Sequence, residues 1–301
     1  MGIIFFNLSP FKFSNILSNS KSPIKEIELL KFSHSSKQCY FEAHAWLKDH
    51  LKFENVDSSN LYGSCDASGT DKYSNIAIWK CISESMERWA YFSLLQSKSK
   101  KYGMEYDKTT TGFSAFPCWP KSYVRSISYG EAIERWAISS WWREKISGQI
   151  FYDHTSDEHG YVVINIGTLK GFVIISFKAS KLKSQSNNFY SYGFAYGTTK
   201  EHALQKAQIE MLRNERVLSV NYDVEPKTIC DQRLKYFSTQ EGFEHFKFKL
   251  VKDFVRVNSF KSPKLIVDEE IPGPWSDFVT VWRCLLEDTD YCWNDHKHFM
   301  F

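Results

Sequence analysis

The chain has 301 residues, of which 43% are hydrophobic, 17% aromatic and 24% charged, and its formal net charge is +3. This composition is typical of a globular protein with one large or two smaller domains, and it excludes a disordered chain. The small net charge, and the lack of any run of roughly 18 to 20 apolar residues, lead us to expect neither nucleic acid nor a membrane as a partner.

The cysteines indicate the compartment. Seven are scattered along the chain, and none forms a Cys-x-x-Cys pair. Their odd number and irregular spacing favour buried thiols over a disulfide framework or a zinc site. The apolar stretch GIIFF near the start is too short for a secretory signal and lacks preceding positive charges. We therefore expect a cytoplasmic protein.

The first 60 residues are polar and rich in serine and lysine around short apolar runs. No motif covers them, so residues 1–60 are treated as an unassigned N-terminal segment, followed by a single domain over residues 61–301. Within the segment, the pattern of residues 39–51 predicts an amphipathic helix. A loop of small residues, GSCDASGTD, then precedes a helix predicted from about Asn75 to Leu95.

A loop followed by a helix occurs twice more. Residues 109–117, TTTGFSAFP, precede a helix predicted from about Tyr123 to Trp142, and residues 192–199, YGFAYGTT, precede one from Lys200 to about Val217. The β-branched runs YVVINIG and GFVIISF predict a hairpin between them, and late strands are expected at PKLIVD and FVTVWRCLL. Helices against a strand-rich background indicate a mixed α/β fold with α+β character.

The first two helices carry nearly the same ten residues. ESMERWAYFS begins at Glu84 and EAIERWAISS at Glu131, and six of the ten positions are identical. At about 3.6 residues per turn, the charged residues of each copy project from one face. These residues are Lys80, Glu84, Glu87 and Arg88 in the first helix, with Glu131, Glu134 and Arg135 in the second.

Two interpretations of this face compete. Ion pairs between residues four apart on a solvated face explain one such helix, but two near copies weaken that explanation. Glutamates three residues apart can direct four carboxylate oxygens to one place, which suits Mg²⁺ bound together with substrate phosphates. The arginines either meet phosphate oxygens directly or hold the glutamates in place. In the third helix, Glu210 at the edge of an apolar stripe needs a partner.

These blocks resemble the YcaO family. GTDKYSNIAIWKCISESMERWA is similar to its Gly-rich loop followed by Glu-x-x-Glu-Arg, while TTTGFSAFP with SISYGEAIERWA is similar to the second block. SYGFAYGTTKEHALQKAQIEMLRNE is similar to the third block, and FVTVWRCLL to the late strand of the family. The resemblance covers roughly residues 63–217. It implies a mixed α/β domain in which glutamate-bearing helices pack on a largely antiparallel sheet.

The resemblance also implies an activity. Characterised members bind ATP and Mg²⁺ at a glutamate-lined site and activate backbone amides of ribosomally synthesised peptides by phosphorylating the amide oxygen, as in bacteriocin biosynthesis. We therefore expect an enzyme that converts Cys, Ser or Thr to azolines by cyclodehydration. Glu84, Glu87, Glu131, Glu134 and Glu210 would bind the metal ions. These glutamates, with Arg88, Arg135, Lys80 and Thr111, would bind the nucleotide, whereas no catalytic residue is assigned.

Some positions depart from the family pattern. Lys80 stands where many members have Ser, Thr111 where Asn is common, and Ile127 where Gln is frequent. These departures keep open a degenerate, non-catalytic scaffold or regulatory subunit. Thioamide formation with a TfuA-like partner is the nearest alternative chemistry. The expected partners are a precursor peptide and a protein that presents it, and the sequence leaves a homodimer open.

Overall fold

The computed structural model describes residues 9–35, 38–52, 59, 61–117, 120–153, 156–181, 188–252, 262–287 and 295–299. In this part of the chain, α-helices and antiparallel strand pairs form the mixed α/β fold expected from the sequence. The chain divides into two compact units. Unit 1 comprises Met1–Val56, Cys65–Tyr129 and Leu265–Leu285, and unit 2 comprises Asp57–Ser64, Gly130–Lys264 and Leu286–Phe301.

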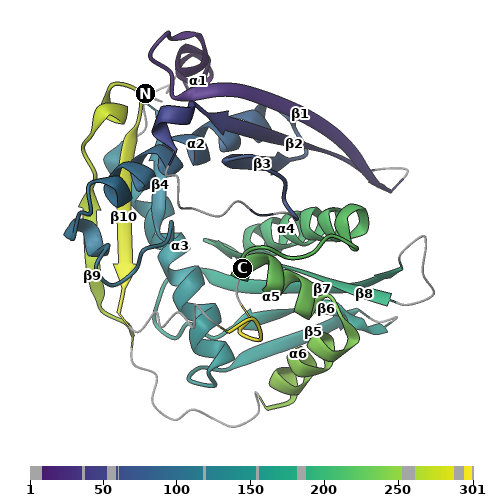
Figure 1. Ribbon diagram of the computed structural model, residues 1–301. Helices are drawn as coiled ribbons and strands as arrows, with labels where there is room; N and C mark the ends of the chain where they lie inside the picture. Colours follow the sequence, from purple (N-terminus) through teal and green to yellow (C-terminus); the bar gives the residue numbers. More distant parts are fainter. Residues whose placement is uncertain are drawn as a thin grey trace, which may run out of the picture. The chain divides into compact units, whose positions relative to one another are not determined.

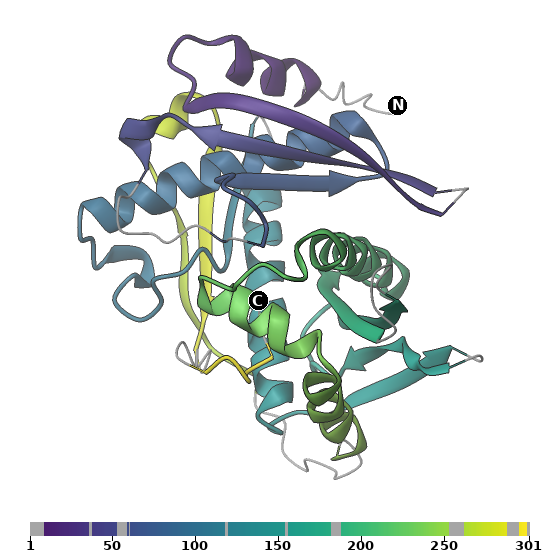
Figure 2. The same ribbon diagram turned by 45° about the vertical axis from the view of Figure 1, so that its right-hand side comes forward.

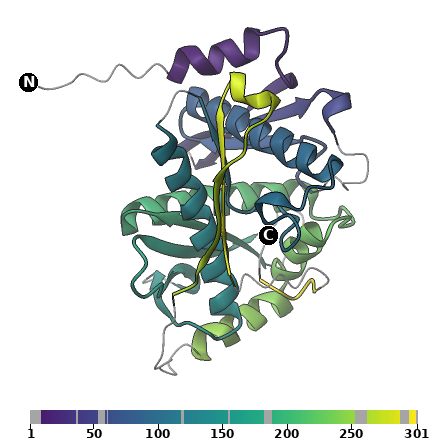
Figure 3. The same ribbon diagram turned by 90° about the vertical axis from the view of Figure 1, so that its left-hand side faces the viewer.

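Unit 1 contains two three-stranded sheets, ordered β1-β2-β3 and β4-β10-β9 (Figures 1 and 3). Helix α2 packs on β2 and β3, and α3 contributes its residues up to Tyr129. The elements are α1 (Ser9–Ser18), β1 (Ile24–Ser35), β2 (Gln38–Leu47), a 3-10 turn (Asp49–Leu51), β3 (Ala67–Asp71), α2 (Ser74–Gln96), a second 3-10 turn (Lys101–Gly103), β4 (Phe113–Phe116), α3 (Lys121–Trp142), β9 (Leu265–Glu270), a third 3-10 turn (Pro274–Asp277) and β10 (Thr280–Leu286).

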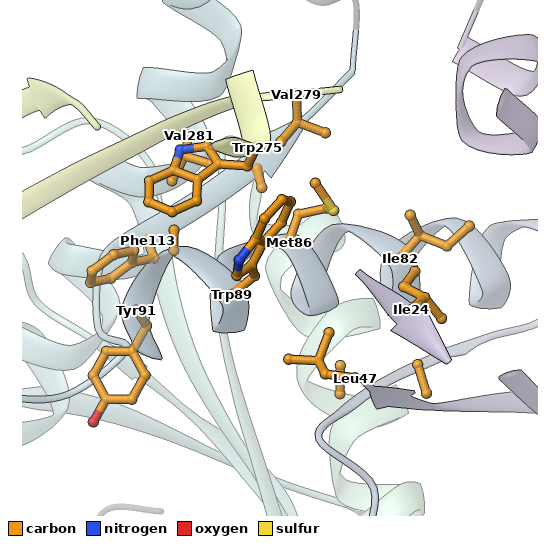
Figure 4. Packing of buried hydrophobic residues seen from close by; sticks show 14 of the residues in the cluster. Ile24, Leu47, Ile82, Met86, Trp89, Tyr91, Phe113, Trp275, Val279 and Val281 are labelled. Carbon is orange, nitrogen blue, oxygen red and sulfur yellow. The ribbon is translucent and has the colours of Figure 1, made fainter. Parts of the chain in front are cut away.

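The core of unit 1 lies between α2 and the strands (Figure 4). Trp89 of α2 packs edge-on against Trp275, with ring centroids 5.8 Å apart. Phe13 of α1 stacks on Trp79 at the other end of the helix, 5.6 Å away. Burial of such large side chains on one side of α2 fixes which face the helix turns to the sheet.

Unit 2 is built on one antiparallel sheet, ordered β5-β6-β7-β8 (Figures 1 and 2). Helix α4 packs on β7 and β8, and Tyr190 of β8 stacks on Phe243 of α6 with ring centroids 3.9 Å apart. The elements are β5 (Gly148–Asp153), β6 (Ser156–Ile164), β7 (Phe172–Lys181), β8 (Asn188–Gly197), α4 (Lys200–Asn221), α5 (Ile229–Phe237) and α6 (Gln240–Lys252), together with α3 from Gly130 onward.

The three helices predicted near residues 75–95, 123–142 and 200–217 are confirmed by α2, α3 and α4. The hairpin is confirmed by the antiparallel pair β6 and β7, and the two late strands by β9 and β10. The helix predicted over residues 39–51 is wrong. Residues 38–47 form β2, the central strand of its sheet, because pairing with β1 and β3 on both sides outweighs the local helical pattern.

The three predicted loops are also wrong in part, because each includes all or part of a strand that precedes its helix. β3 and β4 lie within the first two stretches, and β8 ends within the third. A Cβ on Gly69 would lie 2.3 Å from the carbonyl oxygen of Ala77, and one on Gly193 would lie 2.2 Å from that of Ala207. These glycines let the helix approach the strand closely, which is a reason for glycine inside a strand rather than a sign of a loop.

Candidate functional site

In unit 1, the predicted glutamates of α2 bind the backbone of neighbouring strands. The Ser68 N–H of β3 donates to Glu84 Oε2 at 3.0 Å. The Ala115 N–H of β4 donates to Glu87 Oε1, also at 3.0 Å. Arg88 donates to the remaining oxygen of Glu84 at 3.2 Å and to Thr110 Oγ1 at 3.2 Å. These side chains are half-buried, so the face is not the freely solvated one that the ion-pair interpretation assumed.

Unit 2 repeats this arrangement on β8. The Tyr196 N–H donates to Glu134 Oε2 of α3 at 2.6 Å, and the Phe194 N–H donates to Glu210 Oε2 of α4 at 2.8 Å. Because these two strand residues are two positions apart, the N–H groups lie about 7 Å from each other along one edge. The structure therefore brings together the carboxylates of Glu134 and Glu210.

All four carboxylates bind the backbone of a strand at the edge of a sheet. Among the strands that the structure describes, β3, β4 and β8 each lie at the end of a sheet, with a strand partner on one side only. Each carboxylate accepts one edge N–H group with one oxygen. A charge-assisted bond of this kind satisfies the strand edge and fixes the side chain, so that the second oxygen has a defined position.

A lysine accompanies the glutamate in both units. Lys80 Nζ donates to the Thr70 carbonyl at 3.0 Å, and Lys206 Nζ donates to the Tyr196 carbonyl at 3.0 Å. In both units the glutamate lies sixteen residues after its strand donor and the lysine ten residues after its strand acceptor. The two units thus contain the same clamp of a lysine and a glutamate on an edge strand.

Lys206 was missed by the sequence reasoning. The signal that could have found it is a spaced repeat: Ala77, Lys80 and Glu84 recur with the same spacing as Ala203, Lys206 and Glu210. Lys80 itself pairs with Asp71 at 2.7 Å and not with Glu84, whose ion-pair partner is Arg88.

The other predicted residues lie as follows. Arg135 lies over the ring of Phe194, with 5.2 Å from its guanidinium carbon to the ring centroid. Thr111 is buried, and its hydroxyl oxygen lies 2.8 Å from Thr109 Oγ1. Glu131 is half-buried in unit 2, and Ile127 is exposed on α3. Among the residues that the structure describes, no three His, Cys, Asp or Glu side chains form a ready metal-binding group.

Burial sets the electrostatics of the pair in unit 2. It raises the pKa of Glu210 to about 7, and the charge of Glu134 adds to the rise, while the bond from Phe194 and the nearby arginines oppose it. Burial also raises the pKa of Glu134, although Lys206 and Arg135 lower it. Two close, half-buried carboxylates favour the binding of a cation, because the cation offsets both the desolvation of the carboxylates and the repulsion between them.

This pKa shift predicts a pH dependence of folding. The pKa of Glu210 is about 7 in the folded chain and 4.5 when the side chain is solvated, as in the unfolded chain. Between these pH values, the folded chain therefore binds more protons than the unfolded chain. The free energy of unfolding should therefore fall as pH rises from about 4.5 to about 7, without added metal. Urea unfolding at a series of pH values measures this slope. Glu210→Gln should remove that component, whereas exposed Glu201→Gln should keep it, and an unchanged slope in Glu210→Gln would contradict the prediction.

No family model matches the sequence, and no curated protein matches it. Solved structures do match. YcaO from Methanopyrus kandleri, bound with AMPPCP and Mg²⁺, is 13% identical with a TM-score of 0.58, covering 99% of this chain and 97% of that one. The chain has the YcaO fold. A chain of the E. coli microcin synthetase McbBCD complex is 12% identical to this chain, with a TM-score of 0.53. A chain of the same complex with pro-MccB17 bound is 11% identical, with a TM-score of 0.54. Each match covers 87% of this chain and 87% of the other.

The resemblance found in the sequence is thus confirmed at the level of the YcaO fold. Over the described part of this YcaO-like chain, no helix combines the length and the apolar character needed to cross a membrane.

Proposed function

We propose that this chain uses ATP and Mg²⁺ to activate backbone amides of a ribosomally synthesised peptide. The observation that carries the proposal is the common geometry of Glu84, Glu87, Glu134 and Glu210, each bound to a strand edge through one oxygen. These glutamates were singled out from the sequence as phosphate-site acids. The fold shared with a YcaO bound with AMPPCP and Mg²⁺, and with a microcin synthetase, supports the same assignment.

The donor set fits the implied ligands. Mg²⁺ prefers a few carboxylate oxygens completed by phosphate oxygens and water, so a carboxylate pair is a sufficient protein contribution. Glu134 and Glu210 would hold such an ion in unit 2, and Glu84 with Glu87 would do so in unit 1. Glu131 lies in the same helix as Glu134. Arg88 is the natural phosphate contact of unit 1, because Thr110 and Glu84 already fix its orientation.

The chemistry needs little more from the chain than positioning and charge. ATP supplies the phosphoryl group that turns the oxygen of an amide into a leaving group. A side-chain thiol or hydroxyl of Cys, Ser or Thr attacks the same amide carbon, and loss of phosphate gives an azoline. The substrate is a precursor peptide, presented by a partner protein in the cytoplasm.

Two alternatives use the same site differently. A thioamide-forming enzyme with a TfuA-like partner would need the same nucleotide site but a sulfur nucleophile. A non-catalytic scaffold would need no nucleotide. Lys80 bears on the scaffold alternative, because Asp71 and the Thr70 carbonyl hold its ammonium, so that it does not neutralise Glu84. An active site is therefore the better account of unit 1.

Calorimetric titration with Mg²⁺ATP tests the proposal. Glu134→Gln removes one charge but keeps an oxygen that can accept from Tyr196. Loss of one charge-assisted contact of about 1.5 to 3 kcal/mol should weaken Mg²⁺ATP binding roughly ten- to a hundredfold with little change in melting temperature. Glu201→Gln, an exposed change on α4, is the control. Failure of the unaltered chain to bind Mg²⁺ATP would refute the proposal in favour of a scaffold.

A further inference from the structure

The central strand of the first sheet has one apolar and one polar face. Side chains alternate along a strand, and Ala43, Ala45 and Leu47 belong to the core that β2 shares with α2. Glu42 and His44 therefore project from the face turned away from α2. Their pairing joins His44 Nε2 and Glu42 Oε1 at 3.1 Å, with side-chain exposures of 16% for His44 and 2% for Glu42.

The register of β2 and β3 extends this polar face. Glu42 lies opposite Thr70, and His44 lies opposite Ser68. Directly opposed residues place their side chains on the same face. Thr70 is 92% buried, yet its Oγ1 has no hydrogen-bond partner in the described part of the chain. A buried hydroxyl without a hydrogen bond lowers the stability of the fold unless a ligand or a water molecule binds to it. The Thr70 hydroxyl therefore marks a binding position for a polar group.

The roles of the two ring nitrogens follow from the pairing. A neutral imidazole carries one proton, and the carboxylate of Glu42 fixes that proton on Nε2. Nδ1 then keeps its lone pair. Glu28 on β1 and Ser68 on β3 lie opposite His44 in the two neighbouring strands.

One bond links this face to the proposed phosphate site. Ser68, the cross-strand partner of His44, is also the residue whose N–H donates to Glu84. Cross-strand partners are about 5 Å apart. His44 therefore lies across from the strand residue whose N–H holds the proposed metal-binding carboxylate at the edge of β3, although its imidazole and α2 are on opposite faces of the sheet; all of these residues belong to unit 1.

We propose that His44 is the base that deprotonates the attacking side chain of the peptide, with Glu42 as its positioning residue and the Thr70 hydroxyl as a contact for the reacting groups. This inference rests on the proposed function. The thiol or hydroxyl proton of a substrate Cys, Ser or Thr passes to Nδ1 as its sulfur or oxygen bonds to the amide carbon. The π electrons of the carbonyl move to the amide oxygen, which takes the γ-phosphoryl group of ATP as the bond to the β-phosphate breaks and ADP leaves. The phosphorylated oxygen then departs as phosphate, and the amide nitrogen loses its proton as the C=N bond of the azoline forms. The proton on His44 passes to water.

The first test compares turnover. A pool of short peptides containing Cys, Ser or Thr, incubated with the full chain and Mg²⁺ATP, is analysed for loss of water by mass spectrometry. His44→Gln keeps a donor for Glu42 but has no basic nitrogen, so turnover should fall about 10² to 10⁴-fold with unchanged Mg²⁺ATP affinity. His159→Gln is a matched control, because that histidine pairs with Asp153 at 3.2 Å on an exposed hairpin. Where the His159→Gln control turns over, equal turnover by His44→Gln overturns the proposal.

Glu42→Gln separates positioning from packing. Without the carboxylate the proton is no longer held on Nε2, so the ring-nitrogen NMR signals of His44 should show protonation of Nδ1 as well, and turnover should fall while Mg²⁺ATP affinity stays unchanged. A role in packing alone would change stability and leave the ring proton on Nε2, which would overturn the role of Glu42.

The second test needs no turnover. Nitrogen NMR of ¹⁵N-histidine-labelled chain at about pH 8 reports which ring nitrogen carries the proton. The chain has nine histidines, and the signal missing from His44→Gln identifies His44. A proton on Nε2 with a bare Nδ1 supports the proposal, and a proton on Nδ1 overturns it. Absence of Mg²⁺ATP binding by the unaltered chain would instead refute the proposed function, whatever the state of His44.

Discussion

Replacing Phe299 by alanine is expected to lower the free energy of unfolding by about 3 to 5 kcal/mol. The ring of Phe299 is fully buried and lies within a cage of aromatic side chains in unit 2. The surrounding rings are rigid and belong to separate helices and a strand, so they cannot close over the empty volume. Their centroids lie 5.0 to 6.3 Å from that of Phe299, and they are Trp141, Trp142, Tyr192, Phe237 and Phe246.

Urea unfolding of the full chain measures this effect, and a matched change is available on α6. Phe248 is 55% exposed, so Phe248→Ala should change the free energy of unfolding by only a few tenths of a kcal/mol. If Phe299→Ala were as stable as Phe248→Ala, the C-terminal segment would not be part of the core of unit 2. A small aromatic molecule that fits the cavity should raise the melting temperature of Phe299→Ala alone.

The helices that carry the glutamates could be predicted because their sequences agree locally with their structure. α2 and α4 have clear periodic apolar faces, and their charged residues recur in a family pattern. The strands before them could not be predicted in the same way. β3 and β8 contain glycines that allow a helix to pack closely against the strand. The need for glycine there comes from this tertiary contact and not from the strand itself.

The same limit applies to the site. Glu84 and Glu134 could be named from the sequence, but their bonds to Ser68 and Tyr196 depend on which strand lies at a sheet edge. His44 was overlooked because residues 39–51 were interpreted as a helix. On a helix, residues two apart point in different directions, whereas on a strand they share a face. The dyad of Glu42 and His44 exists only in the strand.

Arg283→Met is expected to destabilise unit 1 by about 3 to 5 kcal/mol, because it leaves a buried carboxylate without its counter-charge. Arg283 is fully buried and Asp107 is 2% exposed, with 3.5 Å between Nη2 and Oδ2. The same guanidinium donates to the Asp107 carbonyl at 2.8 Å and lies over the ring of Phe113. Because both side chains are buried, water can reach the Asp107 carboxylate only if the core around it opens.

The loss should reach the proposed nucleotide site. Asp107 Oδ1 accepts from the N–H and hydroxyl of Thr109, so the Arg283 contact fixes the turn that leads to Thr110, the partner of Arg88. We therefore expect weaker Mg²⁺ATP binding in Arg283→Met as well as easier unfolding.

A double variant separates the charge from the shape of the arginine. If the unpaired carboxylate is the cause, adding Asp107→Asn to Arg283→Met should recover part of both losses, because the buried charge is then gone. Lys25→Met is the control, since its partner Asp49 and Lys25 itself are both largely exposed and the change should stay within about 0.5 kcal/mol. Chemical unfolding and calorimetry of the four chains decide the matter. No recovery in the double variant would mean that Arg283 stabilises the turn through its packing on Phe113 and not through its charge.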